Sequence, residues 1–433
     1  STALNGEVNG DQAQMFGRRF AGLAAILSGM PQPEARLLSV GFAVRTAGIL
    51  AGPAPRAVRV RACIDYFYSQ AAVIHHAGAA DVKTVHERLN AATWTKHDLG
   101  VSHARVSGPT PQGPIAVNLL VSTAKLRALD CRDHGSDLVS ASRTHDAVAA
   151  TSGGFFLYSE ADIEAPCHRT DPVGALISDG QIVAVPSFRR ACLVQRAGRP
   201  AGIEILGPAG MVIGWTGGSE AVQAVNAHGP GTRAFNRAFG QTSPDDGRPA
   251  IAVVGRVVVA CGNGPMDIPL NGLVIHLDVR PVGPVTFEMP KPGGTIVEAM
   301  GGGPILLSDY LPVRDLVAED FAGTAPPVTF SQDETFDQNL LPRMVVGSRP
   351  DGALVFAAIE GRSFEESPGF TLRQSADLLA AAGCTMAMNL DGGSSKRMVV
   401  GHSVVDRPST ELRVDSKAPT AVRPVHTAVL LLR

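Results

Sequence analysis

Several features are scarce or missing in this sequence of 433 residues. Only 4 Tyr and 2 Trp are present, and no run of about 18 apolar residues marks a membrane-spanning helix. The net charge of −2 provides no basic excess of the kind that nucleic-acid-binding proteins carry. We therefore exclude a membrane span and a nucleic-acid partner. A hydrophobic fraction of 45% with 18% charged residues predicts a globular protein with a buried core.

Closely paired cysteines are also missing, since no two cysteines form a C-x-x-C motif. This absence disfavours a zinc site of the common kind. The spacing is too sparse to demand disulfides in a chain of this length, so we predict buried free thiols. The six cysteines are Cys63, Cys131, Cys167, Cys192, Cys261 and Cys384.

The first 110 residues carry no chemical motif and are rich in Ala and Arg. Residues 18–30 form a short apolar stretch without a clear cleavage site after it, which favours an amphipathic helix over a signal peptide and a cytoplasmic over a secreted location. We predict a mainly helical N-terminal extension over residues 1–110 and a catalytic domain over residues 111–433.

Glycine and proline are abundant, with 47 and 31 copies, and favour many turns between short strands. Ser178-Asp179-Gly180-Gln181 separates two apolar runs and predicts a hairpin, as does Gly198-Arg199-Pro200. Pro350-Asp351-Gly352 predicts a turn between Met344–Val346 and Leu354–Ile359. Residues 251–261 fit either a hairpin or one buried strand.

One helix is well marked, between Thr371 as N-cap and Gly383 as its end, with Gln374 placed to complete a capping box. Residues 386–390 then predict a short buried strand that leads into Asp391. From these elements we expect an α+β fold, in which a large curved mixed or antiparallel sheet is packed against helices.

The turn Asp391-Gly392-Gly393-Ser394-Ser395 is the clearest candidate for chemistry. Two glycines allow a positive φ and a close approach to a ligand, and successive amides in such a turn can bind an anion. Two hydroxyls can donate to phosphate oxygens. An ordinary structural turn remains the alternative.

Three further clusters precede this turn, at residues 151–156, 301–307 and 342–369. In this order they resemble the phosphodiester glycosidase family over about residues 114–433, and Asn389-Leu390-Asp391-Gly392-Gly393 with its spacing from Arg343 is the specific part. Three features depart from the family pattern: Ser152 stands where the family has Asn, Glu360 stands where it has Asp, and the turn after Asp391 has one glycine fewer than the commonest form.

The resemblance implies a hydrolase that releases a sugar by cleaving its anomeric carbon–oxygen bond to phosphate. The leaving phosphomonoester has a second pKa of about 6, so it departs without a strong general acid. The expected partner is a small sugar phosphodiester. No cofactor is expected and no metal-ligand spacing stands out, although a cation near the carboxylates stays open, as does the oligomeric state.

On this resemblance, Asp391 is the candidate base or nucleophile, or else a structural turn carboxylate. Glu360 is the candidate second carboxylate, or else a packed acid at a strand end. His168, in the loop after Phe156, is a candidate for proton transfer.

Phosphate binding is assigned first to Arg343 and then to Arg362, because a guanidinium matches phosphate in a bidentate way. For Arg362 a surface ion pair is the alternative. The remaining predicted contacts to the substrate are Gly392, Gly393, Ser394, Ser395, Asn389, Ser152, Gly153 and Gly154.

Two other functions stay open. A phosphodiesterase or phosphohydrolase that attacks phosphorus would use the same groups, and a carbohydrate-binding relative would keep the fold without the chemistry. The lysine-poor, alanine- and arginine-rich composition suggests a bacterial source, where natural-product or polysaccharide metabolism is a reasonable setting.

Overall fold

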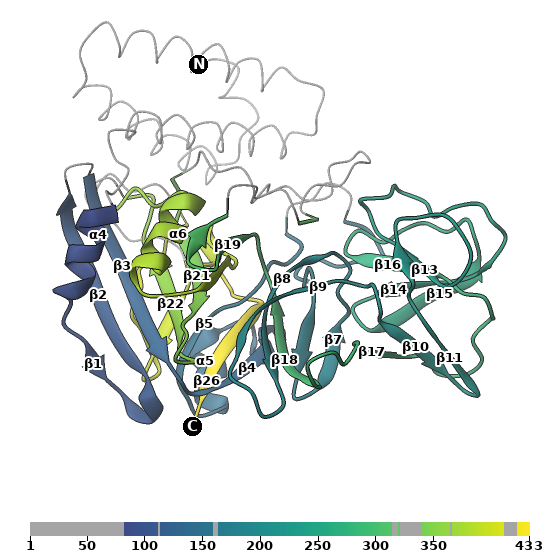
Figure 1. Cartoon of the computed structure of the whole chain (residues 1–433), viewed down its shortest axis with the longest axis horizontal. Coiled ribbons are helices and arrows are strands. Elements are labelled where there is room, and N and C mark those ends of the chain that lie inside the picture. Colours follow the sequence, from purple (N-terminus) through teal and green to yellow (C-terminus); the bar gives the residue numbers. More distant parts are fainter. Residues whose placement is uncertain are drawn as a thin grey trace, which may run out of the picture.

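The computed structural model describes residues 82–110, 113–158, 163–313, 319–320, 340–363, 366–410 and 422–433. Within these ranges the chain forms 26 strands in five sheets but three α-helices (Figure 1). The predicted α+β class is therefore wrong, because the described chain is mostly β. The abundance of glycine and proline was the better guide, since short strands joined by turns fill the structure.

The N-terminal part also differs from its prediction. The structure describes its last residues, which form α4 (Val82–Asn90), β1 (Thr95–Lys96) and β2 (Ser102–Thr110), with a short 3-10 turn at Asp98–Gly100. Residues 1–81 lie outside the described residues. The described end of this segment thus combines one helix with two strands, and the prediction of a mainly helical extension fails for it.

The physical reason is a period of two along β2. Ala104 and Val106 are buried, whereas Arg105 and Ser107, which follow them in turn, are exposed. Such alternation belongs to a strand with one covered face. The whole of β2 pairs antiparallel with β3 (Gly113–Ser122), so tertiary pairing overrides the helix preference that the composition suggested.

The largest sheet has eight strands in the order β1-β2-β3-β22-β21-β23-β19-β20, and every neighbouring pair is antiparallel. The hairpin predicted around Pro350-Asp351-Gly352 is confirmed as β21 and β22. The later strands of this sheet are β19 (Ile305–Ser308), β20 (Leu311–Pro312), β21 (Arg343–Ser348), β22 (Leu354–Ile359) and β23 (Met386–Asn389).

One face of this sheet is covered by α6 (Leu372–Ala381), which lies over β21 and β22 in Figure 1. The predicted capping box is confirmed: Gln374 N donates to Thr371 Oγ1 at 3.2 Å, and Thr371 N donates to Gln374 Oε1 at 2.8 Å. Leu372 and Leu379 of α6 pack with alternate residues of β22 in one apolar cluster. The helix is thus fixed at its start by hydrogen bonds and along its length by burial.

A second sheet has the order β25-β24-β5-β26-β4, and α5 (Leu138–Thr144) packs on its outer face. Asp137 caps α5, and a 3-10 turn at Cys131–His134 precedes it. Its strands are β4 (Lys125–Asp130), β5 (Ala147–Ser152), β24 (Met398–Val400), β25 (Ser403–Val404) and β26 (Thr427–Leu432).

The third sheet, in the order β7-β6-β18-β8-β9, contains both hairpins predicted between residues 173 and 204. Asp179 and Gly180 in the first turn both have positive φ, of 48° and 73°, as a tight two-residue turn requires. Its strands are β6 (Leu176–Ser178), β7 (Gln181–Ala184), β8 (Arg190–Arg196), β9 (Gly202–Leu206) and β18 (Ile296–Gly301).

The remaining two sheets form a lobe at one end of the molecule, on the right in Figure 1. Residues 251–261 are a hairpin, not one strand, because β14 and β15 pair across Gly255. The strands of the lobe are β10 (Val212–Trp215), β11 (Gly218–Ala221), β12 (Ala224–Val225), β13 (Arg233–Phe235), β14 (Pro249–Val254), β15 (Val257–Asn263), β16 (Gly272–His276) and β17 (Thr286–Glu288).

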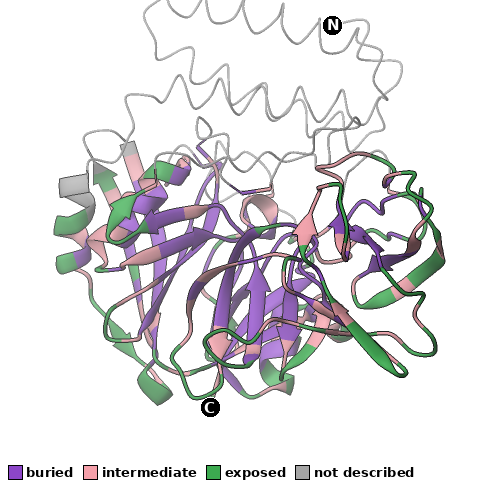
Figure 2. Ribbon diagram, turned by 45° about the vertical axis from the view of Figure 1, so that its right-hand side comes forward, coloured by how far each residue is buried: buried purple, intermediate pink, exposed green. Residues whose placement is uncertain are grey.

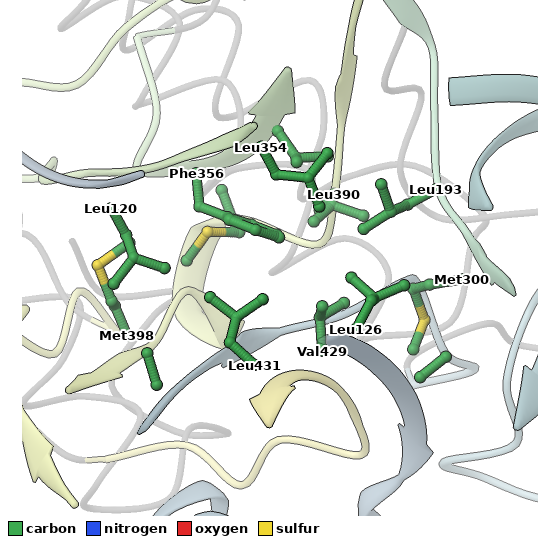
Figure 3. Close-up of a cluster of buried hydrophobic side chains, with 14 of the residues drawn as sticks. Leu120, Leu126, Leu193, Met300, Leu354, Phe356, Leu390, Met398, Val429 and Leu431 are labelled. Carbon is green, nitrogen blue, oxygen red and sulfur yellow. The ribbon is translucent and has the colours of Figure 1, made fainter. Parts of the chain in front are cut away.

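The main core lies between the first sheet, the second and the third. Figure 3 shows Phe356 of the first sheet and Leu390, which follows β23, facing Val429 and Leu431 of the second sheet. All six residues of β22 are buried, and they alternate between this core and the α6 side. Buried positions run along these inner strands, whereas exposed residues lie on the outer loops and on strands at the edge of the molecule such as β15 (Figure 2).

All five described cysteines are free. Four of them are buried, as predicted, whereas Cys261 is exposed on β15. No helix in the described ranges is long and apolar enough to cross a membrane.

Phe356→Ala tests the importance of the main core. Phe356 is fully buried at the centre of β22, so the substitution should lower the free energy of unfolding by about 3–5 kcal/mol. Urea denaturation measures this change. Leu311→Ala, at a side chain that is 70% exposed, is the matched control and should change stability by less than about 0.5 kcal/mol. An equal effect of both substitutions would contradict the assignment of the core.

Candidate active site

Four segments far apart in the sequence meet at the turn after β23. Asp391 N donates to Gly153 O at 2.9 Å, Gly303 N to Asn389 O at 2.8 Å, and Gly393 N to Pro342 O at 2.7 Å. The contacts run through main-chain atoms, so they fix the position of Asp391 largely independently of side chains. The clusters singled out in the sequence are thereby brought together.

Glycine is required at two of these contacts. A Cβ atom at Gly154 would lie 1.9 Å from Gly301 O, and one at Gly392 would lie 2.8 Å from Pro342 O. Both distances are too short for any side chain. The glycines at these points therefore allow main chains to approach each other closely, and Gly154 lies against Gly301.

The amides of the turn are only partly available to an anion. Gly393 N donates to Pro342 O, and Ser395 N donates to Gly392 O at 3.0 Å. Both amides are thus used within the protein. A bound anion at this turn would depend on the other groups around it more than on the four successive amides that the sequence suggested.

Arg362 lies at this turn. Its Nη1 donates to Ser394 Oγ at 2.8 Å and to Ser409 O at 2.7 Å, and its backbone has a φ of +60°. The residue is only 8% exposed, which excludes the alternative of a surface ion pair. A buried guanidinium beside the Ser394 hydroxyl is a suitable arrangement for a phosphate.

Arg343 is the first residue of β21 and is also buried, at 3% exposure. Its Nε donates to Phe370 O at 3.1 Å, and its Cα would be 3.1 Å from a Cβ at Gly392. The main chain of Arg343 therefore borders the Asp391 turn. The structure brings the predicted phosphate-binding arginines to the same turn.

Glu360 takes part in a buried ion network. Its carboxylate accepts from Lys396 Nζ at 3.0 Å, Asn118 Nδ2 at 3.0 Å and Arg407 N at 3.0 Å. Lys396 is fully buried and also donates to Asp406 Oδ2 at 2.6 Å. A carboxylate held by this many donors is well suited to position neighbours, which favours the structural alternative for Glu360.

His168 does not lie in this cluster of contacts. Its side chain is 76% exposed, and its Nδ1 is 3.7 Å from Asp171 Oδ2 on the same loop. The loop after Phe156 thus directs this histidine to solvent, which gives no geometric support to its predicted role in proton transfer.

His426 is a histidine near the site that sequence reasoning missed. It is 9% exposed, its Nδ1 is 2.7 Å from Ser136 Oγ, and its ring centre is 4.3 Å from that of Phe156. The next residue, Thr427, accepts from Gly153 N at 2.9 Å through its carbonyl. Burial, followed by the charges of Arg423 and Arg132, lowers the pKa of His426 to about 4. The imidazole is therefore neutral at neutral pH.

No sequence signal marked His426, because it stands alone without a motif. Lys396 and Asp406 were missed for a similar reason, since nothing in their spacing predicts that a fold would pair them. The one signal for Lys396 in the sequence is its position directly after the Asp391–Ser395 motif.

Ser152, which replaces the family's Asn, has its hydroxyl engaged by main chain. Its Oγ donates to Asp391 O at 3.3 Å and accepts from Arg397 N at 3.3 Å. Ser152 is 1% exposed. The described contacts of Ser152 thus link the end of β5 to the Asp391 turn. Asn389 is fully buried, and its Nδ2 donates to Gly303 O at 3.2 Å.

In the described part of the chain, no group of three or more His, Cys, Asp or Glu side chains could hold a metal ion.

The described fold is mostly antiparallel β, with the buried Arg362 beside the turn that follows Asp391. Residues 250–432 match the model of the phosphodiester glycosidase family. This stretch includes Arg343, Arg362 and the Asp391 turn. The resemblance predicted from the sequence is therefore confirmed for this part of the chain.

Individual relatives are more distant. A hypothetical protein from Synechocystis has a similar structure, with a TM-score of 0.50 and 19% identity over 78% of this chain and 63% of its own, which shows the fold alone. Thus the chain spans less than two thirds of that protein. An uncharacterized SPbeta prophage-derived protein of Bacillus subtilis is 41% identical over 59 residues, which are 14% of this chain and 9% of that protein.

Two further structures have TM-scores below 0.5. A putative exported protein from Burkholderia pseudomallei has a TM-score of 0.48 and 23% identity over 76% of each chain. The catalytic domain of zebrafish N-acetylglucosamine-1-phosphodiester alpha-N-acetylglucosaminidase, auto-inhibited by its pro-peptide, has a TM-score of 0.43 and 14% identity over 79% of this chain and 87% of that domain.

Lys396→Met tests the buried ion network. The substitution leaves the carboxylates of Glu360 and Asp406 without their shared cation, so the free energy of unfolding should fall by about 3–5 kcal/mol. Chemical denaturation gives the value. Lys291→Met removes an exposed ion pair 3.7 Å long and should change stability by less than about 1 kcal/mol. A Lys396→Met protein as stable as wild type would show that the network is dispensable.

His426→Gln tests the buried imidazole through pH. Since the pKa falls from 6.5 in the unfolded chain to about 4 in the folded one, only the unfolded chain takes up a proton between these values. The stability of the wild type should therefore decrease as pH falls from 6.5 to about 4, and His426→Gln should reduce that decrease. Thermal unfolding across this range measures it, with the exposed His168→Gln as control. Parallel pH curves for His426→Gln and wild type would refute the assignment.

Proposed function

We propose that this protein is a hydrolase that cleaves the bond between the anomeric carbon of a sugar and a phosphodiester oxygen. The observation that carries the proposal is the contact of the Arg362 guanidinium with Ser394 at the Asp391 turn, inside the stretch that matches the phosphodiester glycosidase family. The guanidinium can bind the phosphate, and the carboxylate of Asp391 can act at the anomeric carbon of the sugar.

The phosphate is assigned to Arg343 and Arg362. Both side chains are buried, and charge-assisted hydrogen bonds are stronger where water is excluded. Binding the leaving phosphate in this way also stabilises the negative charge that develops on it as the bond breaks. The departing group has a second pKa of about 6 and needs little protonation.

Asp391 is assigned to the sugar side of the reaction. It is 7% exposed and is held by its amide to Gly153. A carboxylate placed there either directs a water molecule to the anomeric carbon or attacks that carbon itself. In both cases it also stabilises the positive charge of an oxocarbenium-like transition state.

Glu360 supports the site indirectly. Its contact with Lys396 fixes the chain that follows the turn, and the contact of Arg407 N with the same carboxylate adds a second constraint. The substrate we propose is a sugar-1-phosphodiester. A bacterial setting in natural-product or polysaccharide metabolism remains a prediction from composition.

The decisive experiment incubates the purified protein with a panel of sugar-1-phosphodiesters, including nucleotide sugars, in isotopically labelled water. Wild type should release free sugar with the label in the sugar. Asp391→Asn should lower kcat by roughly 10²–10⁴-fold, because it removes the base or nucleophile. Asp351→Asn changes a carboxylate that is 58% exposed in the β21–β22 turn and should leave kcat unchanged.

Each of the other possible results would indicate a different function or a different role for Asp391. Label in the phosphate would identify attack at phosphorus and replace the glycosidase by a phosphodiesterase. Sugar release by Asp391→Asn at the wild-type rate would keep the activity and remove Asp391 from it. Binding of substrates without any release would indicate a carbohydrate-binding relative.

A further inference from the structure

A second buried cation lies next to Lys396 and has no counterpart in the ion network. Arg397 is 4% exposed, and its Nη2 is buried with no hydrogen-bond partner in the ranges that the structure describes. Burial of a guanidinium nitrogen without a partner is unfavourable, since the group loses water and gains nothing in return. A bound anion would supply the missing hydrogen-bond acceptor.

The nearby buried acids are engaged elsewhere. Glu360 and Asp406 both contact Lys396 Nζ, at 3.0 Å and 2.6 Å, and Asp406 Oδ1 also accepts from Met398 N at 2.6 Å. Lys396 thus has two carboxylates within its reach, whereas no ion pair of Arg397 is found among the described residues. Nη2 of Arg397 is therefore left without an acceptor among the residues that the structure describes.

Arg397 is also fixed to the candidate active site by its main chain. Ser152 N donates to Arg397 O at 2.9 Å, and Arg397 N donates to Ser152 Oγ at 3.3 Å. The same hydroxyl donates to Asp391 O at 3.3 Å. One serine therefore connects the backbone of the arginine to that of the candidate catalytic carboxylate, so the two residues keep a constant separation.

We propose that Arg397 binds the phosphate group of the substrate, a role that rests on the proposed function. A phosphate oxyanion supplies the hydrogen-bond acceptors and the charge that the buried guanidinium lacks. The planar fork of arginine suits such an anion better than the compact ammonium of lysine. Arg397 thereby adds to Arg343 and Arg362 a phosphate contact on the Ser152 side of the turn.

Inorganic phosphate is the probe for this proposal, and calorimetry with the full chain is the measurement. Arg397→Met removes the charge and keeps most of the length of the side chain. It should weaken phosphate binding by at least about tenfold, as expected for the loss of a charged hydrogen bond. Arg397→Lys should bind phosphate with an intermediate affinity. Arg143→Met, at an exposed position in the last turn of α5, should bind phosphate like wild type.

Thermal unfolding separates a ligand contact from a structural one. Without phosphate, Arg397→Met should be at least as stable as wild type, because the buried Nη2 has no hydrogen-bond partner to lose among the described residues. Added phosphate should raise the melting temperature of wild type and Arg143→Met but not that of Arg397→Met. Unchanged phosphate affinity in Arg397→Met would overturn the proposal. If Arg397→Met does not fold, unchanged affinity in Arg397→Lys overturns it and reduced affinity supports it.

The same variants separate this proposal from the proposed function. Phosphate binding that depends on Arg397, in a protein that releases no sugar from any substrate of the panel, would support the anion site and refute the hydrolase. Sugar release with the same KM and phosphate affinity in wild type and Arg397→Met would support the hydrolase and refute the role of Arg397.

Discussion

The buried ammonium of Lys396 connects three parts of the chain that carry the candidate active site. It joins Glu360 at the end of β22, Asp406 after β25, and the segment that follows the Asp391 turn. Because both acids and the lysine are almost fully buried, each needs the others to offset its loss of water. The position of the turn therefore depends on a charge balance inside the protein as well as on packing.

The sequence predicted local structure well where one short motif decides it. The helix after Thr371, the strand that leads to Asp391 and the hairpin at Asp179-Gly180 all have the expected form, since caps and turn residues act on their immediate neighbours. The fold class was wrong for the opposite reason. Ala104 and Val106 lie in a strand because β3 pairs beside them, and composition carries no record of that partner.

In the candidate site, too, the sequence marked the residues that stand in local motifs and missed those that only the fold brings together. The glycine clusters and both arginines were recognisable in order along the chain, and the structure brings them to one turn. His168 was proposed from its place in a loop, but loop position does not fix the direction of a side chain. Conversely, His426 lies close to Gly153 only because β26 pairs with β5, which is a contact between strands far apart in the sequence.

That last pairing has a consequence for how the protein is made. A ribosome synthesises the chain from its N-terminus, so β4 and β5 emerge early and β26, which lies between them, emerges last of the described elements. Until then both strands have an unpaired edge, and the carbonyl that holds Gly153 does not exist. The contact of Gly153 with β26 therefore forms only after β26 has been synthesised, and until then the exposed edges of β4 and β5 can pair with other strands.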